Sequence, residues 1–169
     1  MAEEKRVLKS TPGARIVHWS HCICWFILLF TGLIMFTDWF SWLTPIFGGA
    51  NGANLFHRIF AVIFAAVPLI GLIYKPKSFI GWMKEAITWG PDDIKFMMMF
   101  PFDLLGFKVF MPPQERINAG QKFNSIFFPL VCLFIGLSGV IMWFAEIFPL
   151  WMVTLAYPIH DLCWILGTM

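Results

Sequence analysis

Charged residues are scarce in this sequence. Asp, Glu, Lys and Arg make up 13% of the 169 residues, against about 25% in typical soluble domains. Hydrophobic residues account for 59%, which is too large a fraction for a soluble domain of this length. The net charge is only +2 and the basic residues are interspersed with acidic ones, so nothing indicates nucleic-acid binding. The shortage of charge predicts an integral membrane protein.

Several chemical signatures are also missing. The sequence has no CxxCH motif, which excludes covalently attached haem c. It contains neither a phosphate-binding glycine loop nor a set of Ser, His and Asp residues for hydrolysis, and no internal repeat is evident. The cysteines all lie in long apolar stretches, where packing roles are more common than disulfides or zinc sites; they are Cys22, Cys24, Cys132 and Cys163. We therefore predict no catalytic residue in this chain.

Long apolar runs are what the sequence does contain. A helix needs roughly 20 mostly apolar residues to cross a hydrocarbon core of about 30 Å. Four segments meet or approach this length, at residues 16–36, 55–74, 124–144 and 156–169. The predicted fold is all-α and integral to the membrane, a bundle of four transmembrane helices that forms a single domain over residues 1–169.

Basic residues are distributed unevenly around these segments. One group precedes the first span, a second lies in the connection at residues 75–123, and Arg58 is the only basic residue elsewhere. Because Lys and Arg accumulate on the cytoplasmic side, we predict that the N-terminus and this connection are cytoplasmic. Prolines divide the connection and prevent one continuous helix; they are Pro76, Pro91, Pro101, Pro112 and Pro113.

On the other side of the membrane, we expect short connections. Residues 37–54 contain Trp39 and Trp42, and such aromatic residues favour the headgroup region of a bilayer. Asn54 is suited to cap the second span. Pro158 is suited to the first turn of the last span, where a missing N–H costs nothing.

The four histidines lie at or within the predicted spans; they are His18, His21, His57 and His160. Ionisable groups at membrane depth are costly and are functional candidates by default. Neutral imidazole is an axial ligand for haem iron, and a bundle can hold haem between facing helices. His57 and His160 are predicted near the outer ends of different helices, so they form the natural pair for one haem. The alternative of another class is a haem-free anchor or small transporter, with histidines as proton or metal sites.

His18 lies at the cytoplasmic end of the first span and needs a different partner. His21 is on nearly the same helix face and cannot approach the same iron from the opposite side. We expect His21 to bond at the interface or to a haem carboxylate rather than to ligate iron. Residues from Pro158 to Met169 cover only about 18 Å. We therefore expect this helix to continue beyond Met169 and to supply the second ligand of an inner haem.

Five local motifs occur together along the chain: His18-Trp19, Phe56-His57-Arg58, Asn118-Ala119-Gly120-Gln121-Lys122, Ser138-Gly139-Val140-Ile141, and His160. In this combination, the sequence from Arg15 onward resembles the cytochrome b (gamma) subunit of respiratory formate dehydrogenases. That group also includes the cytochromes b of thiosulfate reductases and hydrogenases.

The resemblance implies two b haems. His57 and His160 would hold the outer haem, and His18 would pair with a histidine about four turns beyond His160, past Met169. It also implies menaquinone binding near the inner haem by Asn118 and Gly120, with Gln121 added by proximity. An amide and a glycine N–H are reasonable donors to a quinone oxygen. The alternative is that Asn118 merely caps the third span.

The resemblance further implies a place in a respiratory complex of the bacterial inner membrane. The chain would anchor a formate dehydrogenase and pass electrons from an iron–sulfur subunit to menaquinone. Formate oxidation at molybdenum or tungsten would belong to another subunit, and the complex could form a higher oligomer. The alternative within the group is a cytochrome b of a hydrogenase or of a thiosulfate/polysulfide-type reductase.

Overall fold

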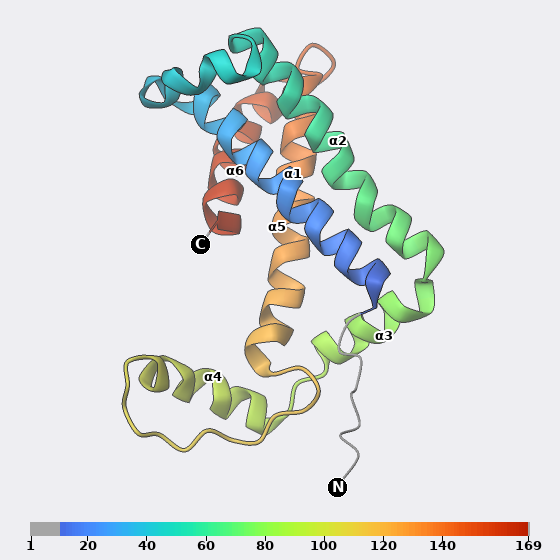
Figure 1. Cartoon of the computed structure of the whole chain (residues 1–169), viewed down its shortest axis with the longest axis vertical. Coiled ribbons are helices and arrows are strands. Elements are labelled where there is room, and N and C mark those ends of the chain that lie inside the picture. The colour runs from blue at the N-terminus through green and yellow to red at the C-terminus, as the bar shows by residue number, and fades with distance from the viewer. Residues whose placement is uncertain (1–10, 169) are drawn as a thin grey trace, which may run out of the picture. The chain divides into compact units, whose positions relative to one another are not determined.

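The computed structural model describes residues 11–168 (Figure 1). In this part of the chain, six α-helices and one 3-10 helix follow one another: α1 (Pro12–Phe36), η1 (Asp38–Phe47), α2 (Ala50–Tyr74), α3 (Pro76–Ile87), α4 (Pro91–Leu104), α5 (Ala119–Trp143) and α6 (Leu150–Thr168). The prediction of an all-α fold is confirmed. The basic residues Lys5, Arg6 and Lys9, used to predict orientation, lie outside the described residues.

Among the described helices, four are long and apolar enough to cross a membrane: α1, α2, α5 and α6. Their lengths of 25, 25, 25 and 19 residues correspond to about 37 Å and about 28 Å at 1.5 Å per residue. Only 6–11% of their most apolar stretches is buried inside the protein. Nearly all of this apolar surface faces outward, as expected where lipid replaces water, and the chain is a multi-pass membrane protein.

The last span begins earlier than predicted. Helix α6 starts at Leu150 instead of Ala156, and Pro158 lies inside it instead of in its first turn. An apolar helix tolerates an internal proline when neighbouring groups satisfy the freed carbonyl. Because α6 starts at Leu150, its 19 residues nearly reach the membrane thickness. The prediction that this helix continues beyond Met169 because it is too short was therefore based on a wrong start. A further histidine beyond Met169 stays a prediction from the resemblance alone.

The connection predicted at residues 37–54 is also more ordered than expected. It forms η1, and α2 then begins at Ala50, which places Asn54 inside the helix and not at its cap. Gly48 (φ 76°) and Gly49 (φ 99°) make the turn between the two helices, and such positive φ angles favour glycine. Helix α2 therefore starts where this turn ends, and Asn54 does not define its start.

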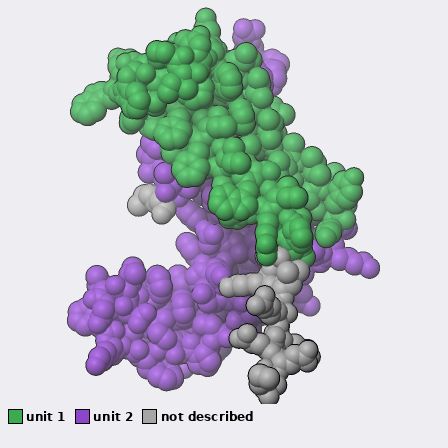
Figure 2. Space-filling model, in the orientation of Figure 1, with its two compact units in different colours: residues 1–75 green, residues 76–169 purple. Residues whose placement is uncertain are grey.

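By their internal contacts, the residues form two compact units, Met1–Lys75 and Pro76–Met169 (Figure 2). In the first unit, α1 and α2 lie side by side and η1 contacts both (Figure 1). In the second unit, α5 packs against α6, and α3 and α4 contact α5. The single domain predicted over residues 1–169 stays a prediction.

The connection predicted at residues 75–123 contains α3, α4 and a segment at residues 105–118 that is mostly without regular structure. Its last five residues belong to α5, which begins at Ala119 instead of residue 124. Pro76 and Pro91 are the first residues of α3 and α4, where the missing N–H is one that a helix leaves unpaired anyway. As predicted, this connection does not form one continuous helix.

Candidate functional site

His57 projects from α2 against the neighbouring helix α1. Its Nδ1 lies 2.9 Å from Oγ1 of Thr31, which is fully buried. The Thr31 hydroxyl also lies 2.7 Å from the Ile27 carbonyl oxygen and 3.2 Å from that of Leu28. Gly32 is next to this contact, and a Cβ there would lie 3.5 Å from His57 Cε1. The ring therefore rests on a side-chain hydroxyl and beside a glycine.

His160 projects from α6 against α5 in the same manner. Its Nδ1 lies 3.1 Å from Oγ of the buried Ser138 and 3.1 Å from the Ile135 carbonyl oxygen. The Ser138 hydroxyl lies 2.7 Å from the Phe134 carbonyl oxygen and 3.1 Å from that of Ile135. A Cβ at Gly139 would lie 3.3 Å from His160 Cε1. A hydroxyl and a glycine again hold the imidazole.

The two arrangements share their position along the helix as well as their chemistry. Thr31 is five residues before the end of α1 at Phe36. Ser138 is five residues before the end of α5 at Trp143, and both helices have 25 residues. In each helix pair, a hydroxyl residue followed by glycine therefore meets a histidine at the same distance from the helix end.

These residues fit the requirements of haem ligation. An axial histidine is neutral, offers one ring nitrogen to iron and usually donates its other N–H to an outer partner. In both arrangements, Nδ1 lies within hydrogen-bonding distance of an oxygen, and the adjacent glycine lets the ring lie against the neighbouring helix. His57 lies in the first unit and His160 in the second, so their pairing on one iron stays a prediction.

The other two histidines differ from these. His18 is exposed on α1, with its ring edge-on to Trp19 at 5.7 Å between centroids and its Nδ1 3.8 Å from Cys22 Sγ. His21 packs on Phe64 of α2 at 4.2 Å between ring centroids. Within residues 11–168, its Nε2 is buried and has no hydrogen-bond partner. His21 thus contributes to packing of the α1–α2 pair, and its expected bonding at the interface or to a haem carboxylate stays a prediction.

The residues predicted to contact quinone form the start of α5. Asn118 Oδ1 accepts a hydrogen bond from the Gln121 N–H at 2.8 Å, and Gln121 Oε1 accepts one from the Asn118 N–H at 3.0 Å. This reciprocal capping box is the helix-cap alternative. The cap engages the two side-chain oxygens and not the amide NH2 donors, which are the groups that a quinone oxygen needs. Gly120 lies in the same turn, and a Cβ added there would lie 3.4 Å from Asn118 Oδ1.

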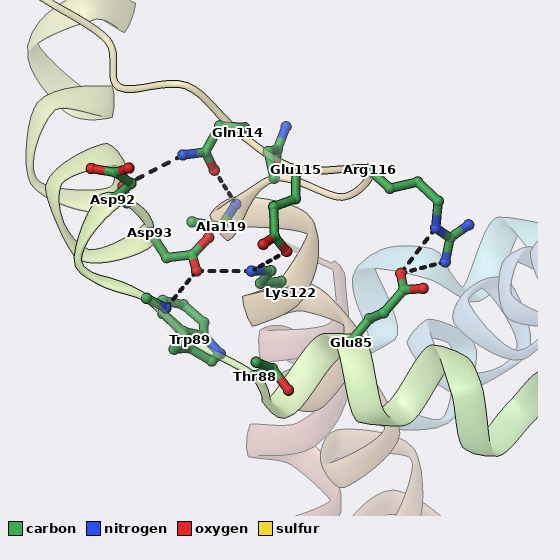
Figure 3. A network of polar contacts seen from close by, with 12 residues as sticks. Glu85, Thr88, Trp89, Asp92, Asp93, Gln114, Glu115, Arg116, Ala119 and Lys122 are labelled. Carbon is green, nitrogen blue, oxygen red and sulfur yellow. Dashed lines mark hydrogen bonds and ion pairs between the residues drawn. The ribbon is translucent and has the colours of Figure 1, made fainter.

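A buried ion pair next to this cap was missed from the sequence (Figure 3). Lys122 is only 2% exposed, and its Nζ lies 2.8 Å from Asp93 Oδ2 and 3.6 Å from Glu115 Oε2. The Gly90 N–H donates to the same Asp93 oxygen at 2.8 Å. Burial raises the pKa of Asp93, but the hydrogen bonds from Gly90 and Lys122 together lower it to below its ordinary value. Asp93 and Lys122 are 29 positions apart, and no sequence pattern predicts that residues so far apart form an ion pair.

Two further contacts hold the segment that precedes α5 (Figure 3). Gln114 Oε1 accepts a hydrogen bond from the Ala119 N–H at 2.8 Å. The Arg116 guanidinium donates from Nε to Glu85 of α3 at 3.0 Å. The turn that carries Asn118 and Gly120 is thus fixed by contacts with both α3 and α4.

This combination of apolar spans and imidazoles held inside helix pairs is characteristic of membrane cytochromes of the b type. The family model of prokaryotic cytochrome b561 matches residues 9–169, and the chain belongs to that family. Membership of the family implies haem b as the cofactor.

Individual relatives agree with the resemblance predicted from the motifs. The chain is 27% identical over 165 residues to a formate dehydrogenase cytochrome b556 subunit of Haemophilus influenzae, covering 95% of this chain and 66% of the relative. It is 29% identical over 168 residues to the cytochrome b556(Fdn) subunit of the nitrate-inducible formate dehydrogenase of Escherichia coli, covering 95% and 71%. The chain thus spans about two thirds of the length of these relatives.

Proposed function

We propose that this chain is the dihaem cytochrome b subunit of a respiratory formate dehydrogenase, in which it anchors the complex and delivers electrons to menaquinone. The names of the relatives support the formate dehydrogenase assignment. The observation that carries the cytochrome function is the matched pair of imidazole sites, Thr31 with His57 and Ser138 with His160. Haem b supplies reversible one-electron chemistry when bound.

The outer haem is assigned to His57 and His160. With the N-terminus and the connection at residues 75–123 both cytoplasmic, α1 and α5 run in the same direction across the membrane. Thr31 and Ser138 are equally far from the ends of these helices, and each contacts one of the two histidines, which supports the proposed pairing.

The inner haem is assigned to His18 together with a histidine beyond Met169, on the resemblance. Menaquinone is assigned to the cytoplasmic end of α5, where the Asn118 amide and the Gly120 N–H would donate to a quinone oxygen, with Gln121 beside them. The capping box and the contacts of Gln114 and Arg116 support this assignment because they hold the turn rigidly. Protons for quinone reduction would come from the cytoplasm.

The proposed partners follow from the same relatives. An iron–sulfur subunit would deliver electrons at the outer face of the bacterial inner membrane, and a molybdenum or tungsten subunit would oxidise formate. The complex could form a higher oligomer. A hydrogenase or a thiosulfate/polysulfide-type reductase is the alternative, since this chain does not contact the primary substrate. A haem-free anchor is set aside because membership of the family implies haem b.

The haem assignment is tested by the visible spectrum of the purified chain and by haem content per chain. We expect reduced b-type bands in the wild type, and loss of the outer haem in both His57→Ala and His160→Ala. Thr154→Val is the control, because Thr154 is exposed on α6 and its hydroxyl bonds to the Leu150 carbonyl oxygen of its own helix, and it should keep its full haem content. Full haem content in His57→Ala would contradict the assignment.

The partner is tested with the complex purified from membranes. Reduction of the b-type bands on addition of formate, abolished when the large subunit is removed, is the expected result. Reduction by hydrogen instead would assign the chain to a hydrogenase. Quinone binding is tested with Asn118→Leu, which should slow menaquinone reduction while haem reduction by formate continues.

A further inference from the structure

The hydroxyl groups of Thr31 and Ser138 each donate their hydrogen to a backbone carbonyl oxygen of the preceding helical turn. A hydroxyl has one hydrogen to donate and two lone pairs that accept. The Thr31 hydroxyl lies 2.7 Å from the Ile27 carbonyl oxygen, which can only accept, so its hydrogen points there. Toward His57 Nδ1, at 2.9 Å, the Thr31 oxygen is therefore an acceptor. This contact requires a proton on Nδ1 and leaves the lone pair on Nε2.

The same reasoning applies to His160. The Ser138 hydroxyl lies 2.7 Å from the Phe134 carbonyl oxygen and donates to it, so its oxygen accepts from His160 Nδ1. The Ile135 carbonyl oxygen, 3.1 Å from Nδ1, is a second acceptor. Two independent acceptors thus specify the same tautomer, with the proton on Nδ1.

We propose that Thr31 and Ser138 are positioning residues that fix the tautomer of His57 and His160, turn Nε2 toward haem iron and tune the reduction potential of that haem. This inference rests on the proposed function, in which these histidines are the axial ligands of the outer haem. An imidazole that donates its second N–H to an acceptor is a more basic ligand. A more basic ligand stabilises ferric iron, so the hydroxyls lower the potential.

Gly32 and Gly139 contribute to the same two histidine sites. Each follows the hydroxyl residue directly and lies beside the Cε1 atom of the histidine. A Cβ at Gly139 would crowd the His160 ring at 3.3 Å, whereas a Cβ at Gly32 would touch the His57 ring at an ordinary contact distance of 3.5 Å. Hydroxyl and glycine together determine both the protonation and the orientation of the ring.

Potentiometric titration of the b-type bands in the purified complex tests this inference. In Thr31→Val, a methyl group replaces the hydroxyl at nearly constant volume, and we expect the potential of the outer haem to shift upward. Ser138→Ala should shift the same haem in the same direction, with haem retained because the Ile135 carbonyl still accepts from Nδ1. Thr31→Ser restores the hydroxyl and should return the wild-type potential.

Thr154→Val in α6 is the matched control. The Thr154 hydroxyl bonds to the Leu150 carbonyl oxygen at 2.9 Å, the same type of bond to the preceding turn, but it is exposed. This variant should keep the wild-type potential, which separates the loss of a histidine acceptor from a general change in helix geometry.

The outcomes distinguish this inference from the function on which it rests. An unchanged or lower potential in both Thr31→Val and Ser138→Ala, with haem bound, would overturn the positioning role and leave the haem assignment intact. Absence of haem from the wild-type complex would overturn the proposed function itself. If Thr31→Val does not accumulate, Thr31→Ala, which removes the same hydroxyl acceptor from His57 Nδ1, decides the question with Thr154→Val as its control.

Discussion

A glycine beside each candidate haem ligand lets the imidazole ring lie directly on the neighbouring helix. The two sites differ in how tightly they are packed. A Cβ at Gly139 would lie 3.3 Å from His160 Cε1, closer than ordinary van der Waals contact, whereas a Cβ at Gly32 would lie 3.5 Å from His57 Cε1. Adding a methyl group to a well-packed site forces side chains or backbone to move.

We therefore expect Gly139→Ala to displace the His160 ring and Gly32→Ala to have little effect. The low end of the cost of overpacking is about 1 kcal/mol, which corresponds to about fivefold weaker haem binding. Haem titration of the purified chain, followed in the Soret band, measures this. Gly136→Ala, in the same helix and with open space around its Cβ position, is the control. Equal weakening in Gly136→Ala and Gly139→Ala would show that helix propensity, and not the ring contact, is responsible.

At this scale, the sequence predicts the histidines but not the groups that hold them. An ionisable residue in an apolar span is conspicuous, so His57 and His160 stand out in the sequence. Thr31 and Ser138 do not, because small hydroxyl residues are common in membrane helices and bond to their own backbone. The separations of 26 and 22 residues between hydroxyl and histidine differ, so the common construction of the two sites leaves no repeat to detect.

The start of helix α5 is stabilised by a charge that is buried. Removing one partner of a buried ion pair leaves the other uncompensated, at a cost of about 3–5 kcal/mol. Asp93 is the nearer partner of Lys122, and Glu115 lies further away at 3.6 Å and is exposed. We expect Asp93→Asn to loosen α4 and residues 105–118 from α5 by an amount near the low end of that range.

Limited proteolysis or amide hydrogen exchange in residues 105–118 measures this loosening. Asp92→Asn is the matched control, because Asp92 pairs with Lys95 at 3.8 Å with both side chains exposed, and such pairs contribute about 0–1 kcal/mol. The pH dependence has a definite sign. The pKa of Asp93 lies below its ordinary value of 3.8, so its stabilisation is complete above 3.8 and is lost as pH falls toward the lower folded value. Asp93→Asn should abolish this acid sensitivity, and a wild-type response in that variant would contradict the assignment.

The helices themselves were predicted more reliably than their ends. The length and apolarity of the four spans are properties of whole segments, and no single residue changes them. The ends depend on local signals that can mislead: Pro158 lies within α6, and Asn54 lies within α2 because the Gly48–Gly49 turn sets the start of that helix. By contrast, the sequence correctly indicated that Asn118 can cap α5, and the Gln121 side chain completes this capping box.

For the whole molecule, sidedness decides whether the proposed electron and proton movements oppose or reinforce each other. If residues 75–123 are cytoplasmic, menaquinone reduced near Asn118 takes its protons from the cytoplasm while electrons arrive from the outer side. Both movements then build the same membrane potential. The apolar spans are compatible with either sidedness, and only the excess of basic residues favours one.

Labelling of single cysteines with a membrane-impermeant maleimide in intact cells tests the orientation. Ser41 lies in η1 and Lys108 in the segment before α5, and both are exposed. We expect Ser41→Cys to label in intact cells and Lys108→Cys only after permeabilisation, because the connection with Lys108 carries seven of the twelve basic residues. The unsubstituted chain is the control for its own cysteines, all of which lie within the spans. Labelling of Lys108→Cys in intact cells would place Asn118 and Gly120 at the outer face, where proton uptake during quinone reduction would no longer add to the membrane potential.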